Sequence, residues 1–446
     1  MSSSLRETLH TLAAHPTDQL DLTALRRGVR RRRRIRAGGV VLALLVIGSG
    51  GWSAVTLLRP GSSQVRFADR PPVVSQPDRR QPSPTEPSRA TEPGPAASPG
   101  AWVDLPDLPG GRRSYAELVW TGSEVLVWGG DRGGETRTDG AAYDPDAGSW
   151  RAVPAAPIAG RYGAALVWTG SEVVVWGGVA GSRTFADGAA WNPRTNRWRL
   201  LAEAPLRPRD NAAATWTGSH LFVWGGAPTQ RPDPDDECPP IPARADGALY
   251  DPARDSWTRL ADAPEARSGA RAITAGDAVV VWGGSRARES VFCDHPETGE
   301  ALMYTPATDS WGRLPEAPIA AGETVALWIG GQLLVVGRDR YGEESQPGAR
   351  YRPESDLSSG EWEPLAKTPR DVLIGGVGDA AWTGDEVLML SAEFHSAAAY
   401  DPALDAWRAL PPSPVSDPVT AVWTGTQLIL QDWQGRAAAL TPPDRS

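Results

Sequence analysis

The sequence predicts an all-β domain, a seven-bladed β-propeller, preceded by one transmembrane helix and a disordered Pro-rich linker. Three observations support this fold class. A pattern of apolar strands returns every 45 to 59 residues after residue 100, an uncharged stretch of 22 residues comes earlier, and Pro-rich sequence separates the two. Nineteen of the 20 Trp residues follow residue 100, so the folding unit is residues 101–446.

Charge divides the chain into unlike parts. The formal net charge is −9, yet residues 1–36 carry nine Arg against three acidic residues, so the excess of acidic residues lies after residue 100. Nucleic-acid binding depends largely on clustered positive charge that meets phosphate groups. We therefore expect no nucleic-acid partner for the domain.

Residues 37–58 contain no charged side chain, and the Arg run at 30–34 with Arg36 lies directly before them. A helix of this length rises about 33 Å, enough to cross a hydrocarbon core of about 30 Å. Positively charged flanks stay in the cytoplasm. The sequence predicts a single-pass cell-membrane protein with a cytoplasmic Arg-rich arm at 1–36, membrane contact through 37–58 and an extracytoplasmic propeller.

A cleaved signal peptide is the alternative interpretation of this segment. Trp52-Ser53-Ala54 resembles a small-residue cleavage site, whereas the 36 residues before the apolar stretch are long for such a peptide. Both interpretations export the domain. Residues 59–100 contain ten Pro and few large apolar residues, so we predict a disordered linker there.

Each repeat has four apolar strands with recurring ends. The first ends Trp-Thr-Gly, the second Trp-Gly-Gly and the third Tyr-Asp-Pro, and the fourth holds a Trp, as in the copy at 116–150. The fourth-strand Trp recurs at Trp150, Trp198, Trp257, Trp311, Trp362 and Trp407. Double glycines follow the second strand at Gly129-Gly130, Gly177-Gly178, Gly225-Gly226 and Gly283-Gly284, and are replaced by Gly337-Arg338, Leu390-Ser391 and Asp432-Trp433 in the last three repeats.

This combination of double glycine, Tyr and Trp resembles the kelch repeat family, across residues 101–446. The resemblance implies a propeller of the galactose oxidase and kelch type, here in a membrane-anchored bacterial form. The two ends of the domain are incomplete: residues 419–442 supply three strands and residues 101–106 a fourth. Because pairing them removes two open sheet edges, we predict that they form the seventh blade together.

The longest insertions follow the second strands of the third and fourth repeats, at 227–245 and 285–299. In antiparallel blades these loops emerge on one face, where we expect a protein or glycan ligand. Each insertion contains one of the two cysteines, and an oxidising compartment favours a disulfide between Cys238 and Cys293. Two free thiols are the alternative.

Charged residues recur at two positions of the first four repeats. Seven residues before the first-strand Trp, or its equivalent, stand Arg113, Arg161, Arg209 and Arg267; four residues before the Tyr position stand Asp139, Asp187, Asp246 and Glu300. Both sets are missing from the last three repeats. This covariation favours structural ion pairs, and an arginine half-ring that binds an anionic ligand is the weaker hypothesis.

Catalytic signals are scarce in the domain. The kelch-type family includes copper-dependent galactose oxidases, but His220, His295 and His395 are the only histidines of the domain and their spacing predicts no metal site. We assign no catalytic residue, metal or cofactor. The favoured function is a membrane-tethered protein- or glycan-binding module; the alternatives are an exported hydrolase or oxidase with its site at the channel mouth, and a purely structural spacer.

Overall fold

The computed structural model describes residues 100–228, 241–288, 299–319, 324–337, 348–367, 377–391, 395–415, 418–432 and 434–443. The predicted cytoplasmic arm, the membrane helix at 37–58 and the linker up to residue 99 lie outside these ranges and stay predictions. Within the described ranges, no helix has the length and apolar character needed to cross a membrane.

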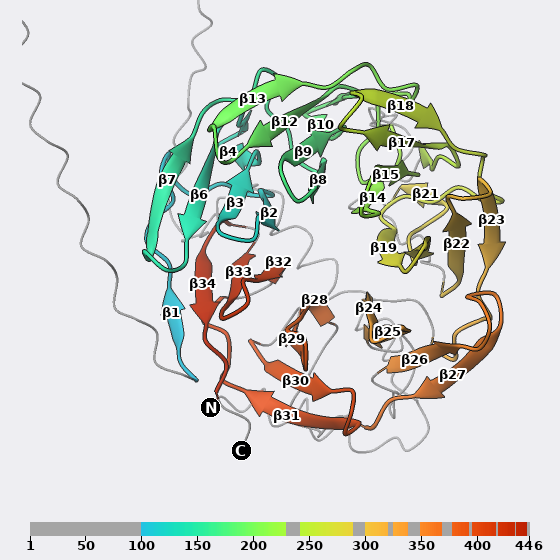
Figure 1. Cartoon of the computed structure of the whole chain (residues 1–446). Helices are drawn as coiled ribbons and strands as arrows, with labels where there is room; N and C mark the ends of the chain where they lie inside the picture. Colours follow the sequence, from blue (N-terminus) through green and yellow to red (C-terminus); the bar gives the residue numbers. More distant parts are fainter. Residues whose placement is uncertain are drawn as a thin grey trace, which may run out of the picture. The chain divides into compact units, whose positions relative to one another are not determined.

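The prediction of an all-β, seven-bladed propeller is confirmed. Seven sheets of four antiparallel strands surround one axis, with the first strand of each blade innermost and the fourth outermost (Figure 1). In blades 1 to 4 these strands are, in order, β2 (Glu117–Trp120), β3 (Val125–Trp128), β6 (Gly140–Asp144) and β7 (Ser149–Val153); β8 (Ala165–Trp168), β9 (Val173–Trp176), β12 (Gly188–Asn192) and β13 (Arg197–Leu200); β14 (Ala213–Trp216), β15 (Leu221–Trp224), β17 (Gly247–Asp251) and β18 (Ser256–Arg259); and β19 (Arg271–Ala275), β20 (Ala278–Trp282), β22 (Ala301–Thr305) and β23 (Ser310–Arg313).

Blades 5 to 7 repeat the arrangement. Their strands are β24 (Thr324–Ile329), β25 (Gln332–Gly337), β26 (Gly348–Pro353) and β27 (Gly360–Pro364); β28 (Val377–Trp382), β29 (Val387–Ser391), β30 (Ala397–Asp401) and β31 (Ala406–Leu410); and β32 (Pro418–Trp423), β33 (Leu428–Asp432), β34 (Ala437–Leu440) and β1 (Trp102–Asp104). Blade 7 therefore combines the two ends of the domain. Trp102 pairs with Leu440 and Asp104 with Ala438 in its outer register.

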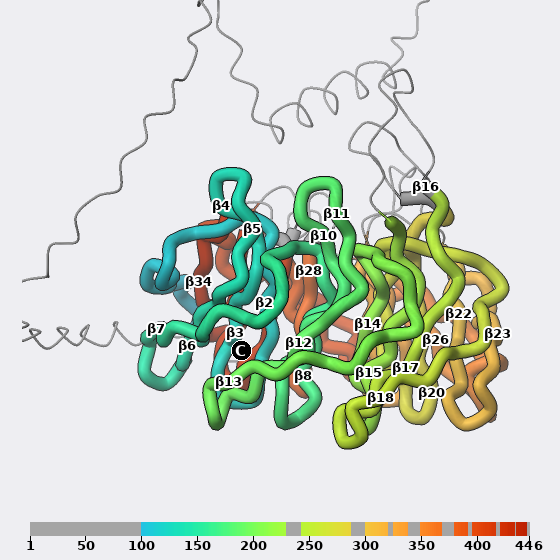
Figure 2. Tube along the Cα trace, turned by 90° about the horizontal axis from the view of Figure 1, so that it is seen from above, coloured from blue at the N-terminus to red at the C-terminus, as the bar shows by residue number. Residues whose placement is uncertain are grey.

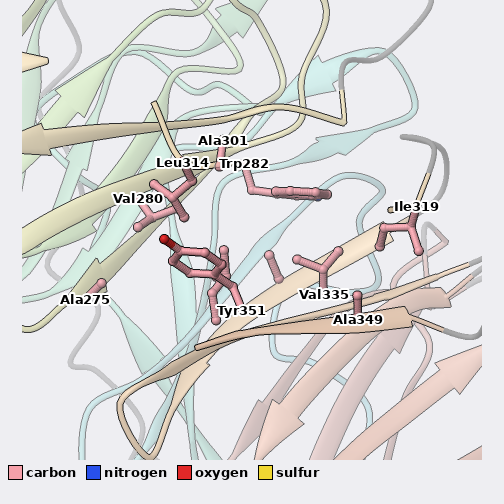
Figure 3. Close-up of a cluster of buried hydrophobic side chains, with 11 residues drawn as sticks. Ala275, Val280, Trp282, Ala301, Leu314, Ile319, Val335, Ala349 and Tyr351 are labelled. Carbon is pink, nitrogen blue, oxygen red and sulfur yellow. The ribbon is translucent and has the colours of Figure 1, made fainter. Parts of the chain in front are cut away.

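The core lies between the blades. Second strands are buried along their whole length, as in β3, because each lies mid-sheet with a neighbouring blade on both faces. Figure 3 shows one such cluster, in which Val280 and Trp282 of blade 4 lie with Val335 and Tyr351 of blade 5. The packing therefore requires apolar residues on both faces of these strands, in place of an alternation of apolar and polar residues.

A ring of hydrogen bonds links every blade to the one before it. The indole Nε1 of each fourth-strand Trp donates to a carbonyl at the end of the preceding fourth strand, over 2.7–3.0 Å. In blade order the pairs are Trp150 to Pro106, Trp198 to Pro154, Trp257 to Ala202, Trp311 to Ala261, Trp362 to Pro315, Trp407 to Ala366 and Trp102 to Pro411. The recurring Trp thus has both a packing and a hydrogen-bonding function.

Three two-stranded sheets extend from the face that carries the loops between second and third strands, which we term the loop face. The hairpin strands β4 (Asp131–Arg132) and β5 (Glu135–Thr136) belong to blade 1, and β10 (Val179–Ala180) and β11 (Arg183–Thr184) to blade 2. The third sheet joins β16 (Ile241–Pro242) of blade 3 to β21 (Ala287–Arg288) of blade 4. Figure 2 shows both hairpins and β16 on the same side of the ring.

One alignment made from the sequence is wrong by a residue. Leu390 pairs with Asp379 and Ala397, as Trp128 pairs with Glu117 and Gly140. Leu390 therefore occupies the second-strand Trp position of blade 6, and Ser391 begins the segment equivalent to the double glycine. The spacing from the first-strand Trp is the same in the two blades, with eight residues from Trp120 to Trp128 and from Trp382 to Leu390, so the sequence itself is consistent with the corrected alignment.

Candidate functional site

The loop face of blades 1 to 4 is organised around the four predicted arginines. Each side chain lies just before a first strand, and its Nη1 donates to two carbonyls of its own blade: that of the glycine directly after the second-strand Trp and that of the predicted acidic residue. The distances to the glycine carbonyl are 3.5, 2.9, 3.0 and 3.1 Å from Arg113, Arg161, Arg209 and Arg267. Those to the backbone carbonyls of Asp139, Asp187, Asp246 and Glu300 are 2.8, 3.2, 3.0 and 2.7 Å.

The acidic side chains lie beside the same guanidinium groups. The nitrogen-to-carboxylate distances are 3.3 Å for Arg113 and Asp139, 2.8 Å for Arg161 and Asp187, 2.8 Å for Arg209 and Asp246, and 3.6 Å for Arg267 and Glu300. In each of the four blades, the guanidinium group therefore joins the start of the first strand, the end of the second and the start of the third.

Blade 4 has a closer acidic partner that the sequence analysis missed. Glu265 lies 2.6 Å from Arg267, and its two oxygens also contact Arg313 and Arg286, each at 3.0 Å. Burial would raise the pKa of Glu265, but the hydrogen bond and charge of Arg267 and the nearby arginines outweigh it and hold that pKa below its usual value. The signal in the sequence was an acid two residues before the arginine, a position that carries no acid in blades 1 to 3.

The burial of these four arginines determines which groups their guanidinium groups can contact. The Arg113 side chain is 1% exposed and the other three are 0% exposed. Burial lowers the pKa of Arg113, Arg161 and Arg267, and the neighbouring carboxylates oppose this change. The guanidinium groups face the carbonyls and carboxylates of their own blades, and a ligand on the loop face meets the loops that they hold, not the charges themselves.

The double glycines connect each arginine to the preceding blade. Gly130 N donates to the Arg161 carbonyl at 3.0 Å, and Gly226 N donates to the Arg267 carbonyl at 2.8 Å. A Cβ atom on Gly129 would lie 2.6 Å from that Arg161 carbonyl, and the φ of Gly129 is +72°. Close approach and left-handed backbone both require glycine here. The motif is therefore a blade-to-blade contact as well as a turn.

The two long insertions meet each other across a blade boundary. Ile241 pairs with Arg288 and Pro242 with Ala287, and Ala243 N donates to the Arg286 carbonyl at 3.1 Å. One antiparallel ladder on blades 3 and 4 thus joins β16, at the end of the first insertion, to β21, at the start of the second. Cys238 and Cys293 lie outside the described residues, so their disulfide stays a prediction.

An aromatic pair lies on the loop face between blades 1 and 2. The rings of Tyr115 and Tyr162 are 5.4 Å apart, and Tyr115 is 45% exposed. Tyr115 has a φ of +57°, at the position where blades 2 and 4 have Gly163 and Gly269. A bulky residue in this conformation is strained. Tyr115 therefore combines an unfavourable backbone conformation with an exposed aromatic side chain, a difference between the repeats that their comparison could have found.

Charged side chains from three distant blades meet at the propeller axis. Arg271 of blade 4 lies 3.3 Å from Asp379 of blade 6, whose other oxygen accepts a 2.6 Å hydrogen bond from Ala421 N of blade 7. Burial, and then the charge of Asp379, raise the pKa of Glu117 in blade 1 to about 7, against the opposing charge of Arg271. All three occupy the position three residues before the first-strand Trp or its equivalent, where the other blades carry Ala165, Ala213, Val325 and Thr420.

No group of three or more His, Cys, Asp or Glu residues in the described ranges is arranged to hold a metal ion. His220 bonds to Ser219, and His395 to the Ser413 carbonyl, in different blades. His295 lies outside the described residues.

Residues 116–338, half of the chain, match the model of the KLHDC2/KLHL20/DRC7 Kelch-repeats domain. This chain belongs to the kelch-repeat family. The match spans the blades in which the double glycines, the arginines and the acids recur together, and it stops at blade 5, where the kelch motif departs from its own pattern.

The kelch propeller resembles the kelch-like protein terF of Aspergillus terreus (strain NIH 2624 / FGSC A1156), with 25% identity over 213 residues. The aligned part is 45% of this chain, and it spans about half, 46%, of that relative. Among solved structures, a fungal alcohol oxidase of the AA5 family in complex with copper matches with a TM-score of 0.54 and 15% identity, over 78% of this chain and 77% of the oxidase. A structure of YjhT matches with a TM-score of 0.47 and 14% identity, over 75% of this chain and 95% of that chain. The likeness to the oxidase shows the fold alone.

Proposed function

We propose that this chain is a membrane-tethered kelch propeller that binds a protein ligand through the loop face of blades 1 to 4. The ladder formed by β16 and β21 carries the proposal. The described ends of the two long insertions pair with each other on the loop face of blades 3 and 4, and loops held by a rigid scaffold are where binding surfaces usually lie.

The rest of the loop face supports the same proposal. The buried arginines fix the loop bases in blades 1 to 4, so little ordering entropy has to be lost when a ligand binds. The Tyr115 and Tyr162 pair adds aromatic surface, and aromatic residues dominate many protein-binding sites. A protein is favoured over a glycan because kelch propellers generally mediate protein binding.

Tethering rests on residues 37–58 and the Arg run before them, which would leave the propeller on the extracytoplasmic side. Fractionation of cells that express the full chain tests this part separately. We expect the chain in the membrane fraction, with the propeller degraded by protease added to intact spheroplasts. Full-length chain in the soluble cytoplasmic fraction would contradict tethering while leaving the binding proposal intact.

The binding test uses the full chain against purified envelope proteins, secreted proteins and envelope glycans of the host. We expect a protein ligand whose affinity falls at least about tenfold, close to 1.4 kcal/mol, when residues 229–240 are replaced by a short Gly-Ser linker. Leu404→Ser is the matched control, because Leu404 is 75% exposed in the turn between third and fourth strands, away from the loop face. A protein that binds both variants equally would overturn the assignment to this face, and glycan binding lost on shortening would change the class of ligand.

A second candidate function is an exported hydrolase with its site at the axis. Two carboxyl groups, Glu117 and Asp379, lie near each other at the axis, and the pKa of Glu117 is raised to about 7; a carboxyl group that can donate a proton near neutral pH beside a second carboxyl group is the usual arrangement in acid-base hydrolysis. Turnover of chromogenic glycosides or esters that disappears in both Glu117→Gln and Asp379→Asn, with folding unchanged, would support this candidate. Turnover that survives both substitutions would exclude the axis as its site.

A further inference from the structure

The blades differ at the second-strand residue that pairs with the first residue of the third strand. Blades 1 to 4 carry Trp there, and each indole packs against the fourth-strand Trp of the following blade. The ring centroids are 5.8 Å apart for Trp128 and Trp198, 5.7 Å for Trp176 and Trp257, 5.3 Å for Trp224 and Trp311, and 6.0 Å for Trp282 and Trp362. In these four interfaces, an indole from one blade therefore fills the space beside a tryptophan of the next.

Blade 7 has Gln431 at this position. Gln431 pairs with Ala437 in the third strand, as Trp128 pairs with Gly140. The following blade is blade 1, whose fourth-strand Trp is Trp150. Among the residues that the structure describes, the seam between blades 7 and 1 thus has the receiving tryptophan but no indole that packs against it. Blades 5 and 6 carry the smaller apolar residues Val336 and Leu390.

A cavity of about 70 Å³ lies at this seam. Its lining includes Gln431, Trp150, Val127, Leu105, Leu108 and Ala437. Four of these residues have equivalents around the Trp128 indole of blade 1. Val127, Leu105, Leu108 and Ala437 correspond in that order to Val175, Val153, Ala156 and Gly140, which contact or cluster with this indole. The cavity therefore occupies the volume that an indole fills in blade 1. A single water needs about 10–15 Å³ measured in this way, so the space is several times larger.

The lining of the cavity also contains an unused hydrogen-bond acceptor. Gln431 is 2% exposed, and its Oε1 is buried with no hydrogen-bond partner. A buried unsatisfied acceptor costs about 1–3 kcal/mol. In blades 1 and 3 the equivalent position holds a tryptophan that is itself a hydrogen-bond donor. The Nε1 atoms of Trp128 and Trp224 donate to the carbonyls of Thr138 and Ala245. A ligand that brings its own N–H group would satisfy Gln431 instead.

We propose that the seam cavity between blades 7 and 1 is a binding site for a planar aromatic group that carries an N–H donor, with indole as the model ligand. The ring would pack on Trp150. The Gln431 amide would turn so that Oε1, which is not exposed to the cavity, accepts a hydrogen bond from the N–H. Arg112 and Arg436 line the cavity together with Asp104 and Asp107, so its charges balance and the lining selects neither a carboxylate nor an ammonium group on the ligand. This site is independent of the insertions on blades 3 and 4.

The test is titration of the full chain with indole, followed by calorimetry and by ligand-observed NMR. We expect saturable binding with one site per chain. In Gln431→Trp the cavity is filled from within, so binding should weaken at least about tenfold while the melting temperature rises. Binding of equal strength to the wild type and to Gln431→Trp, or absence of binding to the wild type at millimolar indole, would overturn the proposal.

Two further variants keep the test decisive if Gln431→Trp does not fold. Gln431→Met preserves volume and removes the acceptor, so indole should bind several-fold more weakly than naphthalene-type rings without a donor. Trp224→Gln recreates the arrangement beside Trp311 and should give the chain a second indole site; unchanged stoichiometry in this folded variant would count against the repeat equivalence.

Comparing indole-3-acetate with a Trp-containing tetrapeptide, each at equal concentration, distinguishes a small metabolite from a partner side chain as the natural source.

Discussion

The indole Nε1 of Trp102 donates a 2.9 Å hydrogen bond to the carbonyl of Pro411, although 309 residues separate them along the chain. Trp102 is the outer-strand tryptophan of blade 7, and Pro411 follows the outer strand of blade 6. This contact completes the ring of seven equivalent hydrogen bonds and holds the N-terminal strand in the blade that the C-terminus builds. Closure therefore depends on residues from both ends of the domain.

Removal of that hydrogen bond should weaken the closed ring. Trp102→Phe keeps most of the aromatic volume and removes the donor, so we expect a loss of about 1 kcal/mol of unfolding free energy and a lower melting temperature. Deletion of residues 419–446 removes three of the four strands of blade 7 and should abolish cooperative unfolding. A deletion variant that melts like the wild type in differential scanning calorimetry would refute closure by both ends.

The buried ion pairs should cost far more to break than exposed ones. Arg209 is 0% exposed and bonded to Asp246 and two carbonyls. Arg209→Ala therefore removes the guanidinium group from those carbonyls and leaves the partly buried Asp246 carboxylate with only the more distant Arg259, at 4.0 Å, among its described ion pairs. We expect a loss of about 3–5 kcal/mol, measured by urea denaturation. Arg254→Ala is the control, because Arg254 is 80% exposed and pairs only with nearby Asp251. Similar losses in the two variants would contradict a structural function of the loop-face arginines.

Glu117 should make the stability of the propeller depend on pH. Its pKa is raised to about 7 from the ordinary value of 4.5, so the folded chain holds a proton that the unfolded chain has lost between these values. Unfolding free energy from this group then falls as pH rises from about 4.5 to 7 and levels off above. Glu117→Gln should remove that slope and stabilise the protein at pH 8, as followed by urea denaturation across the range. Glu361→Gln, an exposed acid on the outer strand of blade 5, should leave the slope unchanged.

The cysteine prediction can be tested on material exported by the host. A peptide map without reducing agent should contain one cross-linked species joining the peptides of Cys238 and Cys293. Both peptides should appear singly after reduction, and Cys238→Ser should abolish the species. Two alkylated, unlinked cysteines in the exported wild type would favour the free-thiol alternative, and would leave the β16 and β21 ladder as the only described link between the insertions.

Local sequence signals predicted much of the fold and part of the loop face. The six recurring fourth-strand Trp residues and the two incomplete ends of the domain together predicted seven blades, because each repeat must satisfy the same packing against its neighbours. The joint appearance of Arg209 with Asp246 pointed to their contact for a similar reason. The alignment failed at Leu390, where neither tryptophan nor glycine marks the end of the second strand, although Leu390 follows Trp382 by the same eight residues that separate Trp120 and Trp128.

Residue spacing within one repeat therefore determined the blades, their order around the ring and the acidic partners of Arg113, Arg161 and Arg209, since these depend on contacts that recur from repeat to repeat. Only the tertiary structure brought Glu117, Arg271 and Asp379 together, placed Tyr115 against Tyr162 and opened the cavity beside Gln431. Those features arise between different blades, across the axis or across a seam. Their distances depend on how seven unequal sheets close on one another, and no spacing along the chain encodes that closure.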